Sequence, residues 1–152
     1  MSQRKRTSGF TLVEILIVVV ILGILAAIVV PQFTSASESA RSSSMSSTLQ
    51  TIRSQLELYQ VQHNGDYPTL AQMWGNLTST TDIDGDTAGS DFGPYLQKAP
   101  DNPFTNDSTC AADNSEDWQY TAASGAIVAV VTQAKITELD LDAADVVAAP
   151  AP

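Results

Sequence analysis

Apolar residues fill the N-terminal part of the chain almost without interruption. Among the twenty positions from 11 to 30, only Thr11, Glu14 and Gly23 lie outside the aliphatic set. About twenty apolar residues in a helix match the roughly 30 Å hydrocarbon core of a membrane. An ordinary secretory signal peptide has a shorter apolar core that ends at a small-residue cleavage site, which this run lacks. The pattern therefore predicts one transmembrane helix over residues 10–31.

Residues 32–62 show a different pattern, in which apolar side chains recur at spacings of four and three. Ser, Thr, Gln, Glu and Arg occupy the other faces, which predicts an amphipathic helix that continues the first one. The apolar stripe is too short for a self-standing coiled coil. We expect the stripe to pack against a small sheet, and its members are Met45, Leu49, Ile52, Leu56 and Tyr59.

The helix is predicted to stop at Asn64-Gly65-Asp66, because Gly65 suits a left-handed cap and Pro68 prevents the helix from resuming. Tyr67 is expected to pack onto the helix and the sheet. Residues 69–77 fit one short helix with an apolar side. Residues 63–152 as a whole are therefore expected to form a small head.

The C-terminal part of this head carries the strand signals. Residues 118–121 and 126–132 are strand-like and flank an Ala-Ser-Gly turn, which predicts an antiparallel hairpin. The apolar residues between 136 and 141 supply a third strand or pack as an irregular tail. From about residue 143 the chain is rich in Ala and Pro and is expected to fray. The predicted fold class is α+β, a long N-terminal helix packed on a small antiparallel sheet.

Charge is distributed unevenly along the chain. The net charge is −10, yet three of the seven basic residues are Arg4, Lys5 and Arg6, ahead of the apolar run. Without residues 1–9 the balance would be four basic against seventeen acidic residues, or −13. The basic cluster predicts a cytoplasmic N-terminus and a head on the far side of the membrane. The acidic head argues against nucleic acid or anionic lipid as its direct ligand.

Glu14 is the one carboxylate in the apolar run, and a charge at membrane depth calls for a named partner. Cleavage after Gly9 would create an α-amino group on Phe10, within a few residues of Glu14. That amine and the carboxylate would then neutralise each other within or between subunits. Gly23 and Pro31 weaken the helix between them, since glycine lacks a side chain and proline lacks an N–H group.

The remaining polar residues give no recognisable catalytic group. His63 is the only histidine and is expected to be solvated or bonded locally, and the single Cys110 is expected to be a free thiol. Asp82, Asp84 and Asp86 alternate as at the start of a calcium-binding loop. The required glycine and the bidentate glutamate are missing, so the ligand spacing does not support calcium. We therefore predict no cofactor, no catalytic or metal-binding residues, and no enzymatic activity.

The motif Gly9-Phe10-Thr11-Leu12-Val13-Glu14 behind a short basic leader resembles the processing site of type IV pilins and type II secretion pseudopilins. The resemblance implies that residues 1–9 are a prepilin leader, that prepilin peptidase cuts between Gly9 and Phe10, and that Phe10 is N-methylated. It also implies that Glu14 pairs with the amine of a neighbouring Phe10 in a filament. In this superfamily the segment matching Gly23 to Pro31 bends or unwinds on assembly; a simple kink at the membrane exit is the alternative.

The head resembles major pseudopilins, the general secretion pathway protein G family, more than type IV pilins. The turn around Tyr67-Pro68-Thr69 is similar to the one after the long helix in those proteins, and a C-terminal cysteine pair common in type IV pilins is lacking. The calcium-binding C-terminal loop of many major pseudopilins has no clear counterpart here.

The expected function is a structural subunit of a type II secretion pseudopilus, which polymerises through its N-terminal helix to drive protein export. The alternatives are a type IV pilin of a surface filament for adhesion, motility or DNA uptake, and a membrane-anchored binding module that never assembles. The expected partners are identical subunits, minor pilins or pseudopilins, prepilin peptidase and an inner-membrane assembly platform. The subunit is expected in the inner membrane as a single-pass protein with a periplasmic head, and the filament in the periplasm or at the cell surface.

Overall fold

The structure, a computed structural model, describes residues 9–150 of the chain. The basic cluster Arg4-Lys5-Arg6 and most of the expected leader therefore lie outside the described residues. The chain divides into two compact units, Met1–Glu38 and Ser39–Pro152, and each is described by itself below. We call the described part of the first unit, residues 9–38, the stem, and that of the second, residues 39–150, the head.

Helix α1 spans Leu12–Gln62 without a break. The predicted stop follows it: Asn64 and Gly65 have positive φ angles of 57° and 94°. The Gly65 N–H donates to the Gln60 carbonyl at 2.9 Å, which satisfies one of the carbonyls left open at the helix end. The end of the helix is therefore where the sequence predicted it.

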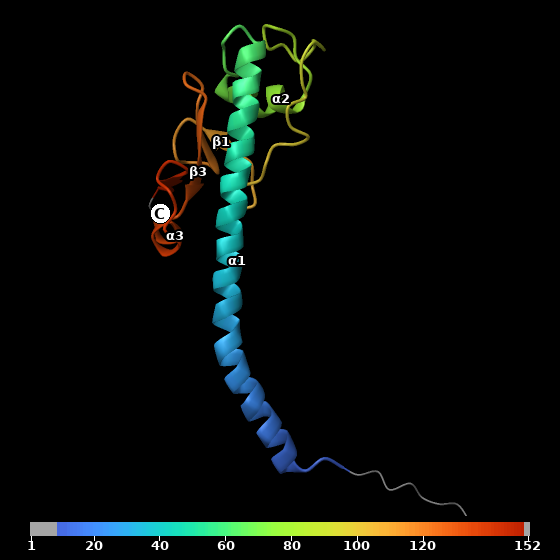
Figure 1. The fold of residues 1–152 in the computed structure, drawn as a ribbon, viewed down its shortest axis with the longest axis vertical. Coiled ribbons are helices and arrows are strands. Elements are labelled where there is room, and N and C mark those ends of the chain that lie inside the picture. The colour runs from blue at the N-terminus through green and yellow to red at the C-terminus, as the bar shows by residue number, and fades with distance from the viewer. Residues whose placement is uncertain (1–8, 151–152) are drawn as a thin grey trace, which may run out of the picture. The chain divides into compact units, whose positions relative to one another are not determined.

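The head is built around the second half of α1, with the sheet packed against it (Figure 1). The five residues of the predicted stripe are the buried residues of α1, each at most 3% exposed. Two short helical pieces, η1 (Leu70–Gln72) and α2 (Met73–Thr78), replace the single predicted helix over 69–77. The partners of the stripe in the core are Met73, Leu77, Trp118, Tyr120, Ile127, Ala129, Val131 and Val146.

The sheet has four strands in the order β1-β2-β3-β4. Strands β2 (Trp118–Thr121) and β3 (Ala126–Val131) form the predicted antiparallel hairpin. The outer strands β1 (Cys110–Ala111) and β4 (Val146–Ala148) both pair in parallel. The predicted α+β fold is confirmed, but the sheet is mixed, because two short strands outside the hairpin extend it on both sides.

Two expectations for the C-terminal part were wrong. Residues 136–141 supply no third strand; helix α3 (Gln133–Leu139) occupies most of that segment and connects β3 to β4. The segment after 143 is not frayed as a whole, since Val146 is 6% exposed and the Ala149 N–H donates to the Val131 carbonyl at 2.9 Å. The parallel pairing of β4 requires a crossover, and α3 provides it.

Tyr67 packs against the core, as predicted. Its ring lies directly on Gly125 at the end of the β2–β3 turn, where a Cβ atom would come within 2.3 Å of the ring. Gly125 also has a φ of +67°, a conformation that glycine adopts most readily. The turn after α1 and the hairpin are thereby held together, and position 125 accepts no side chain without a rearrangement.

Candidate assembly site

The N-terminal end of α1 is organised by Thr11 and Glu14. The Glu14 carboxylate accepts hydrogen bonds from the Thr11 N–H at 2.8 Å and from the Thr11 hydroxyl at 2.7 Å. The Glu14 N–H in turn donates to the Thr11 hydroxyl oxygen at 3.2 Å. This reciprocal arrangement is a capping box, in which two polar side chains satisfy open N–H groups of a first helical turn. The capping box was not among the sequence predictions, although Thr-x-x-Glu before an apolar run is its signature.

Gly9 and Phe10 precede the helix and are exposed, with Phe10 at 80%. The bond between them, where cleavage is expected, therefore lies outside regular secondary structure. In the uncut chain described here Glu14 is bonded to Thr11. Its expected pairing with a Phe10 amine, like cleavage and methylation, stays a prediction, because that amine exists only after processing.

The apolar half of α1 is exposed on every side. Residues 9–37 are all exposed, and the large aliphatic side chains from Leu12 to Val30 include Ile17 at 53% and Leu22 at 57%. A helix that is apolar all round requires an apolar environment, either a protein core or a membrane. This helix is long and apolar enough to span a membrane, and its apolar window is not buried in the protein. The core-helix alternative is therefore ruled out for this segment.

Gly23 and Pro31 lie inside α1, which remains helical through both positions. No atom outside the helix backbone lies within 4 Å of a Cβ built on Gly23. Beyond Pro31, the Thr34 and Ser35 hydroxyls donate to the carbonyls of Val30 and Pro31 at 3.3 and 3.1 Å. These bonds give the backbone alternative partners near the proline. Bending or unwinding between Gly23 and Pro31 stays a prediction.

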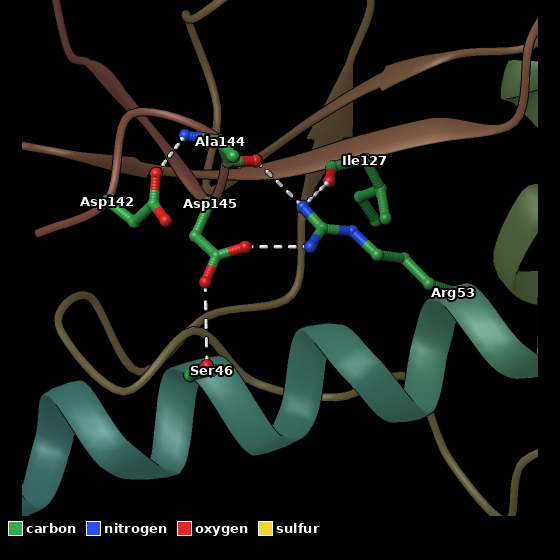
Figure 2. Close-up of polar contacts among 6 residues, drawn as sticks. All are labelled: Ser46, Arg53, Ile127, Asp142, Ala144 and Asp145. Atoms are coloured by element: carbon green, nitrogen blue, oxygen red, sulfur yellow. Dashed lines mark hydrogen bonds and ion pairs between the residues drawn. The ribbon is translucent and has the colours of Figure 1, made fainter.

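In the head, Arg53 joins α1 to the C-terminal strands (Figure 2). Its guanidinium donates to the Asp145 carboxylate at 2.7 Å, and to the carbonyls of Ile127 and Ala144 at 2.9 Å each. Ser46, two turns earlier on α1, donates to the other Asp145 oxygen at 3.5 Å. Because the Arg53 and Asp145 side chains are only 34% and 21% exposed, this contact is better shielded than an ordinary surface pair. We call these four hydrogen bonds the Arg53 clamp.

His63 is buried, at 3% exposed, so of the two alternatives expected for its ring, solvated or bonded locally, the structure excludes the first and confirms the second. Its Nδ1 lies 2.8 Å from the Tyr59 carbonyl and its Nε2 lies 2.9 Å from the Thr81 hydroxyl. Since a carbonyl only accepts, Nδ1 carries a proton, and Nε2 shares a hydrogen bond with the Thr81 hydroxyl. The ring also stacks on Tyr59 with centroids 3.6 Å apart. His63 therefore has a packing role with local hydrogen bonds.

Cys110 is a free, partly buried cysteine. Its thiol donates to the Met73 sulfur at 3.6 Å, and burial raises its pKa to about 12. A thiol with so high a pKa is protonated at neutral pH and is a poor nucleophile. The expected free thiol without activation agrees with this setting.

The turn that carries Asp82, Asp84 and Asp86 is held by hydrogen bonds between its own backbone N–H groups and its aspartate side chains. Asp82 accepts hydrogen bonds from the N–H groups of Asp84 and Asp86, at 3.0 and 2.8 Å, and Asp86 accepts one from Ala88 at 2.9 Å. Among residues 9–150 no group of three acidic, Cys or His side chains is placed to hold a metal ion. Calcium binding stays an untested hypothesis.

Two family models match the chain. The prokaryotic N-terminal methylation motif matches residues 4–30, and type II secretion system protein G matches residues 32–125. The second match ends at the β2–β3 turn, so β3, α3 and β4 lie beyond it.

Known proteins give the same picture. The type II secretion system core protein G of Aeromonas hydrophila is 34% identical over 104 residues, which is 68% of this chain and 72% of that protein. The protein of the same name in Pseudomonas aeruginosa is 38% identical over the same shares. That of Vibrio cholerae is 33% identical over 70% of this chain and 72% of its own length. No solved structure matches the chain. With more than half of its residues in the protein G match, the chain belongs to the type II secretion system protein G family.

Proposed function

We propose that this protein is a structural subunit of a type II secretion pseudopilus that polymerises through the apolar half of α1. The observation that carries the proposal is an exposed apolar helix with one carboxylate in its first turn, in a member of the protein G family. Among residues 9–150 nothing buries the apolar half of this helix. A bilayer before assembly, and the helices of other subunits after it, would supply the apolar environment that it needs.

Processing would give Glu14 its assembly partner. Prepilin peptidase would cut the exposed bond between Gly9 and Phe10, and methylation would follow on the Phe10 amine. The match to the N-terminal methylation motif supports both steps. A neighbouring Phe10 amine could then take over the Glu14 carboxylate from Thr11, which holds it before assembly. The exchange keeps the carboxylate hydrogen-bonded throughout, which low-dielectric surroundings require.

The chain is anchored in the inner membrane through its apolar helix; we propose a cytoplasmic N-terminus and a periplasmic head. The basic residues ahead of the helix support this orientation. Its partners would be identical subunits, minor pseudopilins, prepilin peptidase and the inner-membrane assembly platform. The matches to protein G favour a secretion pseudopilus over a surface pilus.

Mass spectrometry of the protein purified from its own membranes tests processing directly. The expected mass lacks residues 1–9 and carries one added methyl group, with Phe10 as the first residue on sequencing. A Gly9→Leu variant is the matched control, since a bulky residue before the scissile bond should leave the leader attached. An intact Met1 in the membrane-inserted wild type would contradict the proposed function.

A further inference from the structure

A small pocket lies in the head beside the C-terminal end of α1. Its volume is about 130 Å³, and its walls come from the last turns of α1, the turn after it, α2 and residues 83–84. Tyr59 and Asn76 are the lining residues from α1 and α2 that are each 3% exposed. The pocket lies wholly within the head.

Several groups that line this pocket can accept a hydrogen bond. The Asn76 amide donates to the Tyr59 hydroxyl at 2.9 Å, while no donor in the described part of the chain bonds the Asn76 Oδ1. Gln72, on the wall, accepts through its Oε1 from the Thr69 hydroxyl at 2.8 Å. Burial raises the pKa of Tyr59 despite the Asn76 hydrogen bond, and the charges of Asp82 and Asp66 raise it further. The Asn76 Oδ1 can therefore accept a hydrogen bond from a donor that enters the pocket.

Two carboxylates stand in the walls of the pocket, those of Asp66 and Asp84. Neither belongs to any of the ion pairs within residues 9–150, and no Lys or Arg lines the pocket. A ligand that fits must therefore bring positive charge and several N–H donors. The guanidinium of an arginine has five such donors in one plane and meets both needs.

Arg41 offers the positive charge and the N–H donors that would complement the pocket. The head contains four basic residues; Arg53, Lys98 and Lys135 form ion pairs with Asp145, Asp101 and Glu138. The exposed Arg41 donates from Nη1 to the Pro103 carbonyl at 3.2 Å, and within residues 9–150 it has no carboxylate partner. This bond orients the guanidinium and leaves its other donors open.

The two features cannot meet within one chain. Arg41 and Tyr59 are eighteen positions apart on the same helix, which at the rise of an α-helix is about 27 Å, far beyond the reach of an arginine. A second copy shifted along the helix axis could bring them together. Contacts between different surfaces of identical subunits build rings where the rotation closes and open helical filaments where it does not, so such a contact is compatible with a filament.

We propose that the pocket formed by Tyr59, Asp66, Asn76 and Asp84 binds the Arg41 guanidinium of a second copy of this chain. The proposal rests on the proposed assembly into a filament and assigns it a contact between heads. Asp66 and Asp84 neutralise the guanidinium, and the Asn76 Oδ1 accepts one of its N–H groups. The contact gives the filament a direction, because the Arg41 guanidinium and the pocket lie at different places on each head.

Cysteine crosslinking in the full-length protein tests the contact. In a Cys110→Ser background that keeps Arg41 and Asp84, Ser42→Cys combined with Ile83→Cys should give a ladder of dimers, trimers and longer species in assembled filaments, because Ser42 follows Arg41 and Ile83 lines the pocket. Ser42→Cys combined with Asp101→Cys is the matched control, since Asp101 is an exposed acid outside the pocket, and should give no ladder. Each single-cysteine variant should give at most dimers.

Charge substitutions give the second measurement. Arg41→Gln should lower the yield of sheared filaments about tenfold, the scale expected for loss of one interfacial charge pair. Lys98→Gln removes the same charge from the head and should leave the yield within about twofold. Combining Arg41→Asp with Asp84→Arg should recover filaments that Arg41→Asp alone loses. Circular dichroism of each full-length variant verifies that the head is folded.

The outcomes separate this proposal from the one on which it rests. Filaments of the variant with cysteines at positions 42 and 83 that give no ladder, or folded Arg41→Gln protein with a normal filament yield, would overturn the pocket contact and leave the assembly proposal standing. A wild type that is processed yet forms no filaments would overturn both. A ladder together with recovery in the charge swap would establish the contact.

Discussion

The two halves of helix α1 follow opposite rules of burial. In the stem, aliphatic side chains surround the helix and are exposed, with Val19 at 53%. In the head, apolar residues form one stripe, and Leu49 and Ile52 are fully buried. One continuous helix thus contains a segment whose apolar surface is satisfied by its own chain and another whose surface is not.

Because of this difference, apolar side chains of the same kind have different effects in the head and in the stem. A buried apolar side chain in the head stabilises the fold by leaving water. An exposed one in the stem contributes nothing to folding and acts only through a membrane or another subunit. Substitutions should therefore separate into those that unfold the head and those that spare the head and stop assembly.

The largest expected effect is that of Glu14→Leu. It should abolish filaments while membrane insertion and cleavage remain largely intact, because the amine of the neighbouring Phe10 loses its counter-charge. Filament shearing and electron microscopy measure assembly, and gel mobility measures cleavage. Val19→Leu is a matched control, since it adds similar bulk without touching a charge. Normal filaments from Glu14→Leu would refute the charge-pair argument.

Trp118→Ala tests the other side of the comparison. Trp118 is fully buried and its indole N–H donates to the Pro100 carbonyl at 3.0 Å. Its removal should lower the free energy of unfolding of the head by about 3–5 kcal/mol, the range for buried aromatic-to-alanine changes. Denaturant unfolding of full-length protein in detergent measures this, and Val19→Ala should leave the same transition unchanged. Equal losses from both variants would mean that the stem contributes to the stability of the head.

Arg53→Met should have a smaller and more local effect. It removes the guanidinium but keeps the aliphatic part of the side chain. The Asp145 carboxylate keeps only the long hydrogen bond from Ser46, and the carbonyls of Ile127 and Ala144 lose the guanidinium donor. We expect a loss of about 1–2 kcal/mol, as for a few hydrogen bonds to a partly shielded charge.

Hydrogen exchange locates this effect. Amides of residues 145–149 should exchange faster in Arg53→Met, while those of the β2–β3 hairpin change little. Lys98→Met, which breaks the exposed pair with Asp101, is the control. It should leave amide exchange in the head unchanged beyond the neighbourhood of residues 98–101. Unchanged protection of β4 in Arg53→Met would show that strand pairing alone holds it.

The features that the sequence predicted correctly are those set by neighbouring residues. The spacing of Met45, Leu49, Ile52, Leu56 and Tyr59 is a property of one helix, and every member is buried. Asn64 and Gly65 ended α1 as expected, and a tight turn gave the β2–β3 hairpin. Local backbone preferences were sufficient in these places.

The errors come from contacts between residues far apart in the sequence. The tail after residue 143 was expected to fray from its Ala and Pro content, yet Val146 fills the core and Asp145 binds Arg53. Composition carries no information about a partner on another element. The candidate site shows the same limit: Glu14 was identified from its place in an apolar run, whereas its bonds to Thr11 and the acceptors around Asn76 required geometry.

The Arg53 clamp has a consequence for the order in which the protein is made. Asp145 follows Arg53 by 92 residues, so the Arg53 guanidinium has no partner at position 145 until almost all of the head has been synthesised. Chains grow at about 5–20 residues per second, so this wait lasts about 5–20 s. During that time the stem is already made and can enter the bilayer, while β3 still lacks β4 along one edge. Anchoring thus precedes closure of the sheet, and each head completes its fold while already tethered at the membrane.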